Sequence, residues 1–196
     1  MLGKAAVTMW WDISADVRAD WEEWHTYEHM PERLGIPGFL RGSRWIGVAD
    51  EGTYFVLYET AELDTVMTGA YLERLNHPTP WSRQMMPHHR NMVRSLCAVR
   101  AYHGHGLGHF MGTVRFSGPL PSLPKARGIT SATLLESQPM QGGPTAEQKM
   151  RGGVDPSADK VLLVGGYDGQ AVQRVANELR LPGAVADLYR LSYTLT

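Results

Sequence analysis

The sequence has a single cysteine, Cys97, and a net charge of only −1 over 196 residues. One cysteine excludes an intrachain disulfide and a cysteine-rich metal site. A nearly balanced charge gives no electrostatic basis for binding nucleic acid or an anionic membrane surface. No apolar run reaches the roughly 18 residues of a transmembrane helix, and the first residues lack the long apolar stretch of a signal peptide. We therefore expect a cytoplasmic protein that has neither nucleic acid nor a membrane as a partner.

The sequence also lacks the glycine-rich signatures of several enzyme classes. It contains neither a Gly-x-Gly-x-x-Gly turn between a strand and a helix nor a phosphate-binding loop with its lysine. It has no Gly-x-Ser-x-Gly elbow either, so nucleotide-dependent and serine-hydrolase activities are not indicated. What the chain does have is 43% hydrophobic and 20% charged residues, which is typical of a folded domain with a substantial core.

Hydrophobic periodicity predicts an alternation of strands and helices in the first half of the chain. The expected order is strand, helix, strand, strand, helix, strand, which is the ferredoxin-like β-α-β-β-α-β unit. A short extra helix is expected after Thr79, which can cap it, with Pro80 at its first position. The strands are expected at residues 5–13, 38–49, 53–61 and 97–102, and the helices at residues 16–30 and 62–75.

The second half repeats this order in a thinner form. Residues 119–128 contain three prolines, so any helix there is short, and residues 139–159 are expected to form a long irregular loop. The strands are expected at residues 110–116, 129–137, 160–168 and 185–195, and a helix at residues 170–181. We predict an α+β fold of two tandem ferredoxin-like halves, residues 1–104 and 105–196, whose antiparallel sheets form an α+β barrel.

The residues suited to chemistry are concentrated toward the N-terminus. All six tryptophans and all eight histidines lie at or before His109. The second half has mostly small aliphatic side chains. We therefore expect the functional site in residues 1–104, with residues 105–196 as its scaffold.

The densest cluster of such residues is a His-x-x-Glu-His pattern formed by His25, Glu28 and His29. At about 100° per residue of an α-helix, Glu28 falls on the side that carries the tryptophans, and His29 lies further out. A carboxylate held among indole rings is suited to work as a general acid or base. Pairing of Glu28 with Arg33 or Arg44 in a purely structural role is the alternative.

The same pattern is the reversed form of a zinc-peptidase motif. His25 and His29 are four residues apart on a helix and can face one ligand, but zinc requires a third protein ligand. The candidates for that ligand are His77, His88, His89 and Glu59. Metal-free acid–base histidines and structural or exposed histidines are the alternatives.

Large side chains elsewhere in the first half could form the wall of a cavity. Trp10 and Trp11 point to opposite faces of the first strand, so one lines the core or cavity and the other packs beneath a helix or a partner subunit. The irregular connection after the second helix could form the cavity mouth. The expected substrate contacts are Trp10, Trp11, Trp24, Trp81, Met85, His88 and His89.

The tandem β-α-β-β-α-β pattern and the stretch W-x-x-W-H-x-x-E-H-x-P-E-R-L-x-x-P-G-F together resemble the dimeric α+β barrel superfamily, in particular EthD-like proteins. Tyr27, Glu28, His29 and Pro31 occupy the Tyr/Glu…His-x-Pro element of those proteins. The resemblance implies paired sheets around a mostly apolar cavity, and a homodimer. The superfamily includes cofactor-free monooxygenases, lactone isomerases, polyketide cyclases and haem enzymes, so the fold does not choose the reaction.

These observations predict a small enzyme that acts by acid–base chemistry on a hydrophobic or aromatic molecule, without a cofactor or metal. It would be a lyase, an isomerase, a cyclase or a cofactor-free monooxygenase. His29 would be the general base or acid, Glu28 would orient it, and Arg33 would stabilise a developing enolate or carboxylate. Tyr27 and His25 would be hydrogen-bonding partners. A non-catalytic ligand-binding protein, or a metal- or haem-dependent enzyme using His25 and His29, are the alternatives.

Overall fold

The computed structural model describes residues 1–139, 143–179, 181 and 183–196, and it shows a closed antiparallel barrel. Eight strands follow each other around the barrel in the order β1-β3-β2-β8-β5-β7-β6-β4. This confirms the predicted α+β barrel. The strands are β1 (Ala5–Asp12), β2 (Phe39–Gly47), β3 (Thr53–Thr60), β4 (Arg90–Gly104), β5 (Phe110–Phe116), β6 (Ile129–Ser137), β7 (Lys160–Gly166) and β8 (Val185–Leu195).

The same strand order occurs twice within the barrel. Strands β4-β1-β3-β2 are neighbours in the first half of the chain, and β8-β5-β7-β6 repeat that order in the second half. The two sheets join where β2 pairs with β8, from Gly42 opposite Leu195, and where β4 pairs with β6, from Cys97 opposite Ser137. The barrel therefore closes within one chain.

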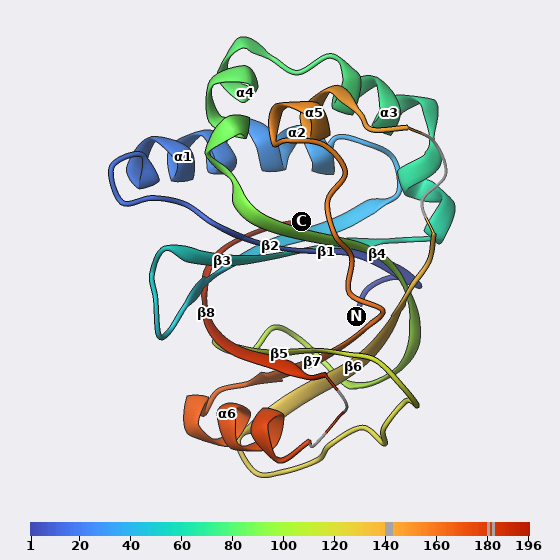
Figure 1. Ribbon diagram of the computed structural model, residues 1–196. Helices are drawn as coiled ribbons and strands as arrows, with labels where there is room; N and C mark the ends of the chain where they lie inside the picture. The colour runs from blue at the N-terminus through green and yellow to red at the C-terminus, as the bar shows by residue number, and fades with distance from the viewer. Residues whose placement is uncertain (140–142, 180, 182) are drawn as a thin grey trace.

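The helices lie on two opposite sides of the barrel (Figure 1). Helices α1 to α5 cover the sheet of the first half, and α6 covers the sheet of the second. The described residues 119–128 contain no helix, in keeping with their prolines. The helical segments are α1 (Arg18–Trp24), η1 (His25–His29), α2 (Met30–Leu34), η2 (Leu63–Met67), α3 (Gly69–Asn76), α4 (Pro80–Met85), η3 (Met86–His88), α5 (Ala146–Met150) and α6 (Gly169–Glu178).

The expectation that residues 139–159 form only an irregular loop is wrong, because this connection between β6 and β7 contains α5. Thr145 and Gln148 form a capping box, in which each side chain bonds the backbone of the other residue. Although α5 belongs to the second half of the chain, it lies among the helices of the first half (Figure 1). Residues 140–142 of this connection lie outside the described residues.

Side chains fill the interior of the barrel. Trp10 and Trp45 both stack on Phe55, with ring centroids 5.1 and 5.4 Å apart. Trp10 Nε1 donates a hydrogen bond to Thr113 Oγ1 at 3.1 Å. The aliphatic residues Leu57, Leu135, Val161 and Leu163 complete this core. The space inside the barrel is therefore packed core.

A second core lies between the outer face of the first sheet and its helices. Trp11 packs there with Trp21, Tyr54 and Met30. Trp10 thus points into the barrel and Trp11 points toward the helices, as expected from the alternation of side chains along a strand. None of the helices among the described residues is long and apolar enough to cross a membrane.

Candidate functional site

The His-x-x-Glu-His pattern lies on a π-helical turn rather than on a regular α-helix. In η1 the Met30 N–H bonds the carbonyl of His25, five residues earlier. The helix then continues as α2 through Pro31, which is placed in the first turn of α2 and does not end the helix as the sequence suggested. Single π-helical turns of this kind are frequent at functional sites.

The extra residue in the π-turn changes which side chains face the core. His25 and His29 are both buried, with ring centroids 5.5 Å apart, whereas Glu28 is only half-buried. The expectation that Glu28 lies on the buried side with His29 further out is therefore wrong, because it assumed about 100° per residue throughout. A wider turn rotates His29 inward.

The buried histidines face a small cavity of about 40 Å³. It lies outside the barrel, bounded by η1 and α2, by strands of the first sheet, and by α5. The lining residues are Met9, Trp11, His25, His29, Arg33, Tyr58, Tyr71, Leu75, Met86, His89, Met92, Arg94, Thr145, Glu147, Gln148 and Arg151. The second half of the chain therefore contributes side chains directly to this site.

Burial keeps all three cavity histidines neutral. It lowers the pKa of His25 and of His29 well below the usual 6.5, and the nearby Arg44 and Arg33 guanidinium groups, respectively, add to this effect. Burial, followed by the charge of Arg151, lowers the pKa of His89 to about 3. A neutral imidazole has one ring nitrogen that can accept a proton.

The three histidines differ in how their ring nitrogens are used. His89 Nε2 accepts a hydrogen bond from Trp21 Nε1 at 3.2 Å, so its Nδ1 carries the proton and donates to the Met86 carbonyl at 3.0 Å. His25 Nδ1 lies 3.4 Å from Arg44, and its Nε2 has no partner among the described residues. His29 Nδ1 likewise has none. His89 is thus fully bonded, and His25 and His29 each have a ring nitrogen available.

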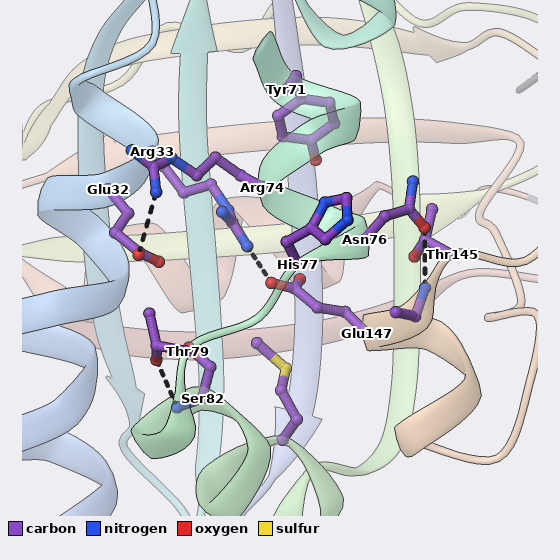
Figure 2. Close-up of polar contacts among 12 residues, drawn as sticks. Glu32, Arg33, Tyr71, Arg74, Asn76, His77, Thr79, Ser82, Thr145 and Glu147 are labelled. Atoms are coloured by element: carbon purple, nitrogen blue, oxygen red, sulfur yellow. Dashed lines mark hydrogen bonds and ion pairs between the residues drawn. The ribbon is translucent and has the colours of Figure 1, made fainter. Parts of the chain in front are cut away.

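An ion pair between Arg33 and Glu147 closes one side of the cavity (Figure 2). The Arg33 side chain is 3% exposed and that of Glu147 is 5% exposed. Burial lowers the pKa of Arg33, but the Glu147 carboxylate raises it, and the net effect is a pKa above its usual value. Arg33 is therefore a permanent cation. The guanidinium also lies 5.9 Å from the Tyr71 ring centre.

Buried polar atoms without a partner are concentrated around this cavity. Of ten such side-chain atoms in the described part of the chain, five belong to residues that line it. Each such atom costs about 1–3 kcal/mol unless something bonds it. The five are Trp11 Nε1, His25 Nε2, His29 Nδ1, Arg33 Nη1 and Tyr58 Oη. Water or a polar ligand in the cavity can supply these missing hydrogen bonds.

Glu28 connects helices instead of facing the cavity. It accepts hydrogen bonds from Trp24 Nε1 at 3.1 Å, from Ser82 Oγ at 3.3 Å and from Thr79 Oγ1. Thr79 is also the predicted N-cap of α4, where its hydroxyl accepts from the Ser82 N–H at 3.0 Å. The alternative in which Glu28 pairs with Arg33 or Arg44 is wrong: Arg33 pairs with Glu147, and Arg44 lies over the rings of Trp21 and Tyr193.

Some of the other predicted site residues line the cavity, and the rest lie elsewhere. Trp11 and His89 line the cavity with His25, His29 and Arg33. Tyr27 is 70% exposed, and Trp10 lies inside the barrel. Trp24 packs on His29, with ring centroids 4.5 Å apart, but lies outside the cavity lining. Trp81, Met85 and His88 also lie outside the lining.

The residues that sequence reasoning missed are Glu147, Tyr58 and Arg151. Tyr58 lies within the predicted third strand, and nothing in its local pattern distinguishes it. Glu147 and Arg151 lie in the segment expected to be an irregular loop. The Thr-x-x-Gln spacing of Thr145 and Gln148 was the available signal, because it is a helix-capping pattern.

The candidate ligands of the zinc alternative do not form a metal site in the described residues, although His89 lines the same cavity as His25 and His29. No three His, Cys, Asp or Glu side chains in the described ranges form a group that could hold a metal ion. His77 is exposed and pairs with Glu73, and the buried Glu59 pairs with Arg41. Dependence on zinc or haem, which was the alternative to a metal-free enzyme, therefore has no assigned set of ligands among the described residues.

Comparison with solved structures finds proteins of the same fold, whereas comparison by sequence finds none. No family model matches the sequence, and no curated protein matches it. An anthrone oxidase-like protein matches with a TM-score of 0.63 and 12% identity, over 97% of this chain and 92% of the other. A "putative monooxygenase" from Fusobacterium nucleatum has a TM-score of 0.56 and 8% identity, over 99% and 95% of the chains.

A second "putative monooxygenase", from Lactobacillus acidophilus, matches with a TM-score of 0.57 and 6% identity, over 98% of this chain and 96% of that one. At such low identities the likeness shows the α+β barrel fold alone. The more specific EthD-like resemblance stays a prediction.

Proposed function

We propose that this protein is an enzyme that removes a proton from a hydrophobic or aromatic small molecule in the cavity between η1 and α5. The observation that carries this proposal is the buried, neutral His29, whose Nδ1 lacks a partner in the same cavity as the cationic Arg33. A proton acceptor and a fixed positive charge in one largely buried site are the two requirements for forming a carbanion or enolate.

Three cavity residues have separate roles in removing the proton. His29 Nδ1 accepts the proton, and the negative charge that develops is stabilised by Arg33. Burial raises the pKa of the Tyr58 hydroxyl, so Tyr58 stays protonated and can donate a hydrogen bond to the same charge. The low pKa of free His29 limits its strength as a base, but a negative charge forming beside it raises the pKa as the reaction proceeds.

The names of the structural neighbours favour an oxidation as the overall reaction. In an anthrone, the CH₂ between two aromatic rings loses a proton to His29. The carbanion gives electrons to O₂, a C–O bond forms, and the resulting peroxide takes up a proton. Loss of water then breaks the O–O bond and leaves a carbonyl, so one anthrone and one O₂ give one anthraquinone and one H₂O.

The test is replacement of His29 by glutamine, which fills the space but accepts no proton at neutral pH. We expect the rate of oxygen uptake with anthrone to fall by about 10²- to 10⁴-fold, the usual contribution of a general base. His77→Gln is the matched control, because His77 is exposed and lies outside the cavity. Equal rates in the parent and His29→Gln proteins, with intact circular dichroism, would contradict the proposal.

Deuterium exchange at the acidic carbon, followed without oxygen, separates proton removal from oxidation. Exchange without oxygen uptake would retain His29 as the base and reassign the enzyme as an isomerase, lyase or cyclase. Tight binding in the parent protein, with neither exchange nor uptake, would favour the ligand-binding alternative.

A further inference from the structure

The cavity that contains His29 and Arg33 is too small for the hydrophobic or aromatic substrate of the proposed reaction. A volume of about 40 Å³ accommodates about three water molecules, far less than one aromatic ring system. A second cavity of about 900 Å³ adjoins it, and both cavities share Arg94, Thr145 and Gln148 in their linings. Thr145 and Gln148 belong to the capping box of α5. The wall that separates the two spaces is therefore built partly by α5.

Displacement of α5 would remove the acidic side chain from an otherwise cationic cavity. Glu147 is the only acidic residue among the described residues that line it, and the cationic ones are Arg33, Arg94 and Arg151. Arg94 donates to the Tyr71 hydroxyl at 2.8 Å, and Arg151 donates to Asp155 at 2.8 Å. Arg33 is the cation that Glu147 itself neutralises.

Arg33 keeps its place on the outer face of the first sheet when α5 moves away. It lies on the continuous η1–α2 helix, and only 2% of the residue is exposed. A buried guanidinium without a counter-charge is strongly unfavourable, so the site favours an anion in the place of the Glu147 carboxylate. Arg33 Nη2 makes the bond to Glu147, and Nη1 has no partner among the described residues.

We propose that the substrate of this site is an aromatic carboxylate, and that its carboxylate replaces that of Glu147 on Arg33 when α5 is displaced. The proposal rests on the proposed function for the identity of the site. In this arrangement Glu147 holds the position of the substrate carboxylate in the free protein. Arg33 Nη2 binds the carboxylate, and Nη1 remains available for the charge that forms when His29 removes the proton.

Calorimetric titration with 1-naphthoate and its neutral analogue 1-naphthamide tests this exchange. The two probes share size and ring system and differ in charge. In Glu147→Gln the competing carboxylate is gone, so we expect naphthoate to bind about tenfold tighter or more, with naphthamide changed less than about twofold. In Arg33→Met the preference for naphthoate over naphthamide should disappear.

Three results would overturn the proposal. They are an unchanged naphthoate affinity in Glu147→Gln, equal tightening for both probes, and no naphthoate binding in either protein. Equal tightening would mean that Glu147 obstructs the site only by its volume.

Hydrogen exchange in the unmodified protein provides a second measurement that does not depend on the folding of any variant. Naphthoate should accelerate exchange of the amides at residues 146–150, and naphthamide should not. Slower exchange there with naphthoate would contradict displacement of α5. Neither experiment involves turnover, so the two proposals can fail separately. If naphthoate does not displace α5 but His29→Gln abolishes turnover, only the carboxylate proposal fails. If naphthoate displaces α5 but His29→Gln leaves turnover unchanged, the site binds carboxylates without the catalytic role.

Discussion

Acidification from pH 7 to pH 4 is expected to unfold this protein. His25, His29 and His89 are buried as neutral rings, and burial lowers the pKa of each below the value of about 6.5 that it has in the unfolded chain. Below pH 6.5 the unfolded state therefore binds more protons than the folded state. The stability from these three groups is fully present above pH 6.5 and is lost as the pH falls toward their folded pKa values.

The expected loss is large in relation to the stability of a typical domain. One histidine that titrates only when unfolded costs up to about 1.4 kcal/mol per pH unit, so three cost up to about 4 kcal/mol per unit. Folded domains are stable by only about 5–15 kcal/mol. A decrease from pH 6 to pH 4 therefore removes enough unfolding free energy to bring the protein close to unfolding.

Urea denaturation between pH 8 and pH 5 measures this effect, and most carboxyl groups titrate only below that range. Replacing His29 by glutamine should reduce the slope of unfolding free energy against pH by about one third. His77→Gln is the matched control, because that ring is exposed and lies outside the cavity. A flat profile between pH 6.5 and pH 5 would contradict burial of the three neutral rings.

Loss of the Glu147 carboxylate is expected to destabilise the protein by about 3–5 kcal/mol. Glu147→Ala leaves the Arg33 guanidinium buried on α2 without its counter-charge. Water that enters the vacated space carries no negative charge, so the guanidinium stays unpaired. Urea unfolding at pH 7.5 provides the measurement.

Two controls show whether the loss of stability comes from burying an unpaired charge or from removing a glutamate side chain in general. The Lys4–Glu62 pair lies on the surface with side chains 77% and 59% exposed, so Glu62→Ala should cost less than about 1 kcal/mol. Replacing Arg33 and Glu147 together by methionine should recover most of the lost stability, because no unpaired charge remains. A cost for Glu147→Ala no larger than that for Glu62→Ala would show that the buried pair contributes little.

The barrel was largely predictable from the sequence. The strands at residues 110–116, 129–137 and 185–195 have the predicted bounds, since each is an apolar run enclosed by polar residues or turn residues. The β2–β3 hairpin follows from the Asp-Glu-Gly turn at residues 50–52. β4 begins at Arg90, seven residues before the predicted start at residue 97, because Arg90 and Asn91 are polar and exposed and the polar Arg94 and Ser95 interrupt the apolar run. Local patterning sufficed for strands that are continuous apolar runs.

The candidate site was predictable only in part. His25, His29 and Arg33 were identified because histidine and arginine are rare in apolar surroundings and therefore conspicuous. Their orientation was not, because no spacing rule shows where a helix accommodates an extra residue. The partner of Arg33 is 114 positions away in sequence. A contact over that separation depends on the closed barrel that brings α5 to the helices of the first half, so local patterning could not indicate it.

Closure of the barrel also determines how copies of this chain can associate. The β2–β8 and β4–β6 pairings use the two outer strands of each sheet, so every described strand has a neighbour on both sides. Open strand edges are the usual template for strand addition and for aggregation. A homodimer, which stays a prediction, must therefore be held by side chains on helices and loops and not by a shared sheet. For the same reason the folded protein should resist edge-to-edge aggregation at high concentration.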